Sequence, residues 1–105
     1  MKTKLIRDLI PHIAASRGQH LDIRVAEPSE LAGLLRDKLR EETEEAVTAE
    51  PAELLDELAD VLEVAHALAR AAGHSLADLD RARAVKAVER GGFTRGLVLR
   101  QEVTA

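Results

Sequence analysis

The 105-residue sequence contains no cysteine, tryptophan or tyrosine, and Phe93 is its only phenylalanine. The lack of cysteine excludes a disulfide framework and thiolate metal ligands, and it favours a reducing compartment. The near absence of aromatic rings argues against a stacking platform for single-stranded nucleic acid. The formal net charge of −4 argues against a general nucleic-acid surface, which needs a basic patch. We therefore expect no nucleic-acid partner.

Long apolar runs are also missing, since no run approaches the roughly 20 residues of a membrane span. The first ten residues carry Lys2, Lys4, Arg7 and Asp8 and do not resemble a signal peptide. We therefore expect a soluble, cytoplasmic protein without a membrane partner. The length suits a single domain over residues 1–105.

Good helix formers, above all Leu, Ala, Glu and Arg, dominate the composition. They predict three longer helices, at about 29–48, 51–72 and 75–90. Ser29, Pro51 and Ser75 suit the starts of these helices, and Gly73 and the pair Gly91-Gly92 suit the ends of the last two. Ser75 and Asp78, three residues apart, come close to a capping box. The short connections predict antiparallel neighbours. The expected fold class is therefore all-α, an antiparallel helical bundle with short extended segments near the termini.

Weaker patterns lie outside the three helices. Pro11 suits the first turn of a short helix over 11–17. Residues 20–26 alternate polar and apolar side chains, which is a weak strand signal. Residues 5–10 can form a short strand or an extended arm, and residues 97–99 can form a strand that pairs with it.

Glutamate occupies a position in the first long helix where an apolar residue is expected. Leu31, Leu35, Leu39 and Ala46 lie within an arc of about 80° around that helix. Glu42 falls inside this arc, and Glu45 lies about 60° to its side. A carboxylate in an apolar stripe must be paired, protonated or bound to a cation.

The second long helix carries Glu57 at one edge of its apolar stripe and Asp60 just beyond. Antiparallel folding about the turn near 48–51 places Glu45 level with Glu57, and Glu42 level with Asp60. Four converging carboxylates repel each other strongly unless something neutralises them. A hard divalent cation does so, which predicts a site for Mg²⁺, with Mn²⁺ as an alternative.

Two other interpretations of these glutamates stay open. Most glutamate runs such as 41–45 are solvated helix faces. Lys38 precedes Glu42 by four residues, so an internal salt bridge can neutralise one carboxylate, although hardly four.

The pattern Glu42-x-x-Glu45 followed by Glu57-x-x-Asp60 resembles the signature of the all-α nucleoside triphosphate pyrophosphohydrolases. That superfamily includes MazG, dimeric dUTPase and phosphoribosyl-ATP pyrophosphohydrolase. Four segments in order resemble those of small MazG-like house-cleaning proteins: KLIRDLIP at 4–11, KLREETEE at 38–45, DELADVL at 56–62 and KAVERGGF at 86–93.

The resemblance implies a Mg²⁺-dependent enzyme that hydrolyses the α–β phosphoanhydride of a nucleotide, giving a monophosphate and pyrophosphate. It implies that Glu42, Glu45, Glu57 and Asp60 hold the metal. Glu41 matches the double Glu of the family. Three roles are open for it: a catalytic base, a residue that supports the metal ligands, or a solvated side chain. Glu41 and Glu42 are therefore the candidate catalytic residues.

Basic side chains are expected to bind the substrate phosphates, and the candidates are Lys38, Lys86 and Arg90. Lys86 and Arg90 share one helix face, which suits a phosphate site. Their positive charges near the C-terminal end of a helix are explained equally well by a favourable interaction with the helix dipole. Lys4 and Arg7 can reach the site from the N-terminal arm, but the sequence does not fix their direction.

The sequence allows more than one interpretation at several further points. The alternatives to a house-cleaning enzyme are phosphoribosyl-ATP pyrophosphohydrolase and a non-catalytic helical interaction module. Gly91-Gly92 can approach phosphate or only end a helix, and Phe93 can stack on a base or fill the core. The four histidines, His12, His20, His66 and His74, receive no role.

Self-association is also expected. Leu34, Val47 and Leu55 broaden the apolar stripes beyond what one hairpin buries, and relatives in the resembled superfamily form dimers or tetramers. We expect a homodimer or a higher homo-oligomer.

Overall fold

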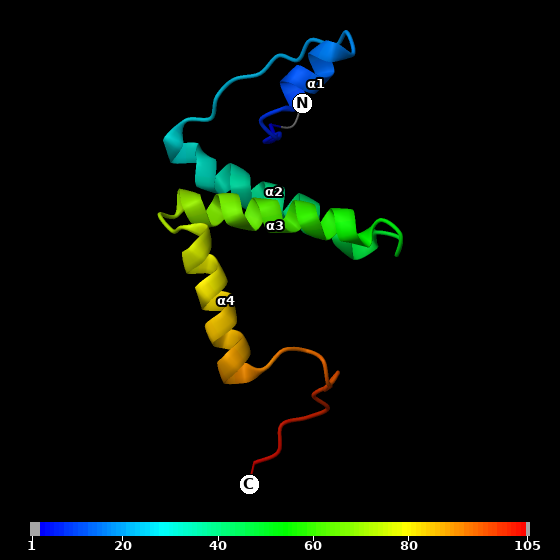
Figure 1. Ribbon diagram of the computed structural model, residues 1–105, viewed down its shortest axis with the longest axis vertical. Helices are drawn as coiled ribbons and strands as arrows, with labels where there is room; N and C mark the ends of the chain where they lie inside the picture. The colour runs from blue at the N-terminus through cyan, green and yellow to red at the C-terminus, as the bar shows by residue number, and fades with distance from the viewer. Residues whose placement is uncertain (1–2, 105) are drawn as a thin grey trace.

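The computed structural model describes residues 3–104, so Met1, Lys2 and Ala105 of the predicted domain lie outside the described residues. Four helices follow one another: α1 (Ile10–Ser16), α2 (Pro28–Thr48), α3 (Leu54–Ala71) and α4 (Leu76–Arg90). Residues 3–104 contain no strand. The prediction of an all-helical fold is confirmed (Figure 1).

Helices α2 and α3 form the centre of the molecule. They lie side by side and run in opposite directions, joined by a short turn (Figure 1). Leu35 of α2 and Val64 of α3 are the buried apolar residues of this hairpin. The predicted level pairing of residues across the turn depends on this arrangement.

The helix boundaries follow local chain chemistry. Pro28 stands at the start of α2, where its fixed φ is favourable, so Ser29 lies in the first turn and Glu27 takes the N-cap position. Residues 51–53 form a turn, and α3 therefore begins at Leu54 rather than at Pro51. Gly73, with φ of 91°, ends α3 in the left-handed conformation that glycine favours.

The strands expected at 5–10, 20–26 and 97–99 are absent from the described chain. A strand needs a neighbouring backbone to complete its hydrogen bonds, and no backbone hydrogen bond joins these segments to a distant part of the described chain. Residues 3–9 instead form an irregular segment above the hairpin, with a turn at 8–9 that leads into the short helix α1 (Figure 1). We call residues 3–9 the N-terminal arm.

Helix α4 contacts α3 near their shared turn and then points away from the hairpin (Figure 1). The structure is accordingly elongated, with principal extents of 64 × 34 × 25 Å. Among residues 3–104, only Ala14, Leu35 and Val64 are buried apolar residues. One chain therefore packs α2 against α3 but does not enclose α4 in a common core.

Within the described chain, no helix combines the length and the apolar character needed to cross a membrane.

The start of α4 is fixed by a capping box, as the sequence predicts. The Asp78 amide donates to the Ser75 hydroxyl oxygen at 3.0 Å, and the Ser75 amide donates to the Asp78 carboxylate at 2.9 Å. Because α4 has little tertiary packing, this cap carries much of its local stability.

We expect Ser75→Ala to weaken α4 locally by about 1 kcal/mol, the usual value of such a cap. Amide hydrogen exchange over 76–90 measures the loss. Ser29→Ala is the matched control, because Ser29 lies inside the first turn of α2 and not at its cap. Equal exchange in the two variants would contradict the importance of the cap.

Candidate metal centre

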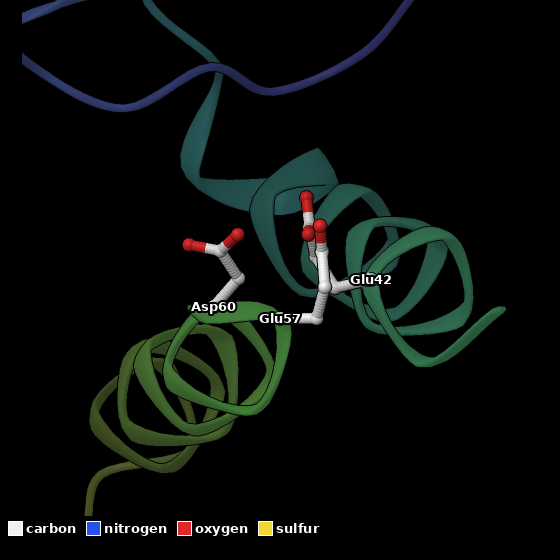
Figure 2. A group of neighbouring side chains, drawn as sticks. All are labelled: Glu42, Glu57 and Asp60. Atoms are coloured by element: carbon white, nitrogen blue, oxygen red, sulfur yellow. The ribbon is translucent and has the colours of Figure 1, made fainter. Parts of the chain in front are cut away.

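Three carboxylates converge across the α2–α3 hairpin. Glu42 from α2 meets Glu57 and Asp60 from α3, and one oxygen from each lies within 4.8 Å of the others (Figure 2). Glu57 and Asp60 share a face of α3 because they are three residues apart. The structure thus brings together three of the four carboxylates that the spacing predicts to meet.

Two oxygens of this cluster lack partners. Glu42 is 7% exposed, and its Oε2 atom finds no hydrogen-bond partner within residues 3–104. The same holds for the buried Oε2 atom of Glu57. A buried, unpaired carboxylate oxygen is costly, since water is lost and nothing replaces it. Oxygens of this kind from opposite helices fit a hard divalent cation.

Lys38 supplies part of the missing positive charge. Its Nζ atom lies 3.3 Å from Oε1 of Glu42 and 3.3 Å from Oε2 of Glu41. Burial acts to lower the pKa of Lys38, but the two glutamates outweigh it, so the pKa is raised. The salt bridge considered from the sequence is therefore present. It leaves Oε2 of Glu42 and Glu57 unpaired.

The electrostatics of Glu42 reflect this incomplete compensation. Burial raises the pKa of the Glu42 carboxyl above its ordinary value, and the charges of Glu45 and Asp60 act in the same direction. Lys38 opposes both effects without cancelling them. Without a bound cation, the ionised form of Glu42 is thus less favourable in the folded protein than in water.

The N-terminal arm brings two further cations to the hairpin. Arg7 donates from Nη2 to Oδ1 of Asp60 at 2.6 Å, and Lys4 Nζ lies 3.6 Å from Oε1 of Glu41. The sequence could not fix these contacts, because the arm has no periodicity that sets its direction. The only signal was two basic residues three apart ahead of Pro11.

Glu41 and Glu45 lie beside the cluster of three. The Glu41 side chain is 33% exposed and pairs with Lys38 and Lys4. Burial acts to raise its pKa, but these lysines prevail and lower it. Glu45 is exposed and outside the cluster found in the described residues, although its charge acts on Glu42. Its role as a ligand stays a prediction.

A cavity of about 770 Å³ separates the N-terminal arm and α1 from the hairpin. Glu42, Asp60 and Lys38 stand on its wall together with Arg7. Most of the remaining lining is aliphatic, and none of the described residues around the cavity is aromatic. The apolar part of the lining comprises Leu5, Ile6, Leu9, Ile10, Ile13, Leu31, Leu35, Val64, Ala67 and Ala71.

The other predicted phosphate-binding residues lie elsewhere. Lys86 and Arg90 are exposed and line a separate hollow along α4, with His74 and Glu89. That hollow lies on the helix that points away from the hairpin (Figure 1). Gly91, with φ of 81°, caps the end of α4. Phe93 is 98% exposed, so the alternative that it fills the core is wrong.

Comparisons with protein-family models, with curated proteins and with solved structures find no match for this chain.

We expect Glu42→Gln to change how stability depends on pH in EDTA. The raised folded-state pKa means that folded Glu42 binds its proton more tightly than the unfolded chain does. Wild-type stability should therefore fall as pH rises from about 4.5, the ordinary value, through the folded-state pKa. Urea unfolding of the variant should lack this component of the fall.

The same variant tests the cation. At pH 7, Mg²⁺ tenfold above its Kd should stabilise the wild type by about 1.4 kcal/mol and should not stabilise Glu42→Gln. Glu44→Gln is the control, because Glu44 is exposed on the same helix. An equal Mg²⁺ effect on all three proteins would rule out Glu42 as a ligand.

Proposed function

We propose that this protein is a Mg²⁺-dependent nucleotide pyrophosphohydrolase that cleaves the α–β phosphoanhydride to a monophosphate and pyrophosphate. The observation that carries the proposal is the pair of buried, unpartnered oxygens on Glu42 and Glu57, beside Asp60. The resemblance of four ordered segments to the all-α pyrophosphohydrolases supplies the reaction.

Glu42, Glu57 and Asp60 would hold the cation between the two helices, with Glu45 as a fourth candidate. When bound, Mg²⁺ supplies a Lewis acid for phosphate oxygens and makes a neighbouring water easier to deprotonate. The chain contributes position: the short turn fixes the register of α2 against α3, and Lys38 limits the repulsion around Glu42.

The two candidate catalytic residues differ in their surroundings. Glu41 is held by two lysines and its pKa is lowered, which makes it a weak proton acceptor. Glu42 belongs to the carboxylate cluster and keeps a buried oxygen without a hydrogen-bond partner. We therefore assign proton acceptance to Glu42, and we assign to Glu41 the positioning of Lys38 and Lys4.

The cavity supports a small-molecule substrate. Its volume of about 770 Å³ falls in the range typical of ligand pockets, roughly 300–1,000 Å³. The charged neighbours on its wall include Arg7, Lys38, Glu42 and Asp60. Aliphatic side chains such as Leu31 and Val64 make up most of the remaining lining. We assign the phosphates to the charged part and the base and sugar to the aliphatic walls.

A panel of nucleoside triphosphates tests this reaction directly. It should contain standard and damaged bases and phosphoribosyl-ATP, with Mg²⁺ or Mn²⁺ and detection of pyrophosphate. Glu42→Gln and Glu57→Gln should lower kcat by about 100-fold or more, because several kcal/mol of transition-state stabilisation depend on the cation. Glu41→Gln should lower it less, and Glu44→Gln should leave it unchanged. If no substrate releases pyrophosphate, the proposed reaction is wrong.

We further propose that two copies of the chain complete the helical bundle. Leu55, Leu58 and Leu62 form one stripe along α3 and are 79%, 48% and 56% exposed. Val47 on α2 is exposed as well, at 74%. Two α2–α3 hairpins that pack through these apolar stripes would form a four-helix bundle. The bundle would bury the apolar surface that a single chain exposes to water.

Sedimentation equilibrium should therefore give the mass of two or more chains, and the melting temperature should rise with protein concentration. Leu58→Glu should shift the equilibrium towards single chains. Leu97→Glu should not, because exposed Leu97 lies in the C-terminal tail and outside the stripe. A wild type that sediments as one chain at every concentration would contradict the assembly.

A further inference from the structure

The N-terminal arm ties the two helices of the acidic hairpin together. Lys4 pairs with Glu41 on α2, and Arg7 pairs with Asp60 on α3. The side chains of Lys4 and Arg7 remain 57% and 55% exposed, so both keep donors that no carboxylate occupies. Arg7 also stands on the wall of the cavity next to Asp60.

Asp60 has two competing roles. It pairs with Arg7, and it belongs to the three-carboxylate cluster that fits a divalent cation. An exposed ion pair contributes little to stability, so it exchanges readily. A divalent cation held by Asp60 would neutralise the charge that attracts Arg7. The Arg7 guanidinium would then lose this carboxylate partner, and its donors would be free for another anion.

A freed guanidinium in this position suits phosphate. Arginine binds phosphate through two parallel N–H donors, a geometry that lysine lacks. The carboxylates open towards the side where the N-terminal segment crosses, drawn in dark blue (Figure 2). Lys38 is 16% exposed and already shared by two glutamates, whereas Lys86 and Arg90 line the separate hollow on α4.

We propose that Arg7, assisted by Lys4, binds the phosphates of the substrate and exchanges Asp60 for phosphate when a divalent cation occupies the cluster. This inference rests on the proposed function, because it assigns the phosphate-binding residues of that same site. In the metal-free protein, Arg7 would then compete with the cation for Asp60. In the protein with a bound cation, Arg7 would bind the substrate phosphates.

Two binding measurements on Arg7→Gln test the exchange. Calorimetry with Mg²⁺ alone should show tighter binding than in wild type, by about 1.5- to 5-fold, because the competing cation is gone. Calorimetry with inorganic pyrophosphate on Mg²⁺-saturated protein should show binding weakened by about 10- to 100-fold. Arg7→Lys should restore part of the pyrophosphate affinity.

Arg24→Gln is the matched control. Arg24 pairs with Glu30, and its side chain is 59% exposed, similar to the 55% of Arg7. Neither Arg24 nor Glu30 belongs to the carboxylate cluster. This variant should match wild type in both titrations. Circular dichroism should show equal helix content in all variants.

The opposite signs of the two effects decide the outcome. If Arg7→Gln weakens both ligands, or changes neither, the exchange is wrong. Failure of wild type to bind Mg²⁺ would overturn both this inference and the metal site. If wild type releases no pyrophosphate from any nucleotide but the opposite effects appear, the phosphate site stands and the proposed reaction falls. If the reaction occurs and the opposite effects are absent, only this inference falls.

Discussion

The rest of the site depends on the repulsion among carboxylates held in one hairpin interface. Packing α2 against α3 brings Glu42 beside Glu57 and Asp60, with two of their oxygens buried and unpartnered. The protein compensates with cations from two directions: Lys38 from the same helix, and Arg7 and Lys4 from the N-terminal arm. The compensation is incomplete, and the cluster that remains has the oxygen ligands that a divalent cation would need.

Helical periodicity explains why much of this could be predicted. Glu42 lies in an apolar stripe, and the spacing of Glu57 and Asp60 puts both on one face of α3. A short turn then fixes which residues lie level, so three of the predicted carboxylates meet. The capping box of Ser75 and Asp78 was predictable for the same reason, because it depends on neighbours within four residues.

What periodicity does not control could not be predicted. The arm lies where its contacts join residues far apart in sequence, such as Arg7 and Asp60, and helical spacing does not specify such contacts. The strands expected at 5–10 and 97–99 needed a partner backbone that the described chain does not place beside them. The course of α4 away from the hairpin follows from the turn at Gly73, and it separates Lys86 and Arg90 from the carboxylates of the same chain.

The aliphatic wall of the cavity has a consequence for molecular discrimination. Side chains such as Leu31, Leu35 and Val64 offer contact area without direction, and a methyl group more or less on a ligand changes affinity by only about 1–3 kcal/mol against such a surface. Directional side-chain contacts come from the seven charged residues of the lining, which include Glu63 and Arg70. A ligand of such a cavity would therefore be selected mainly by its charged groups and only weakly by the size of its apolar part.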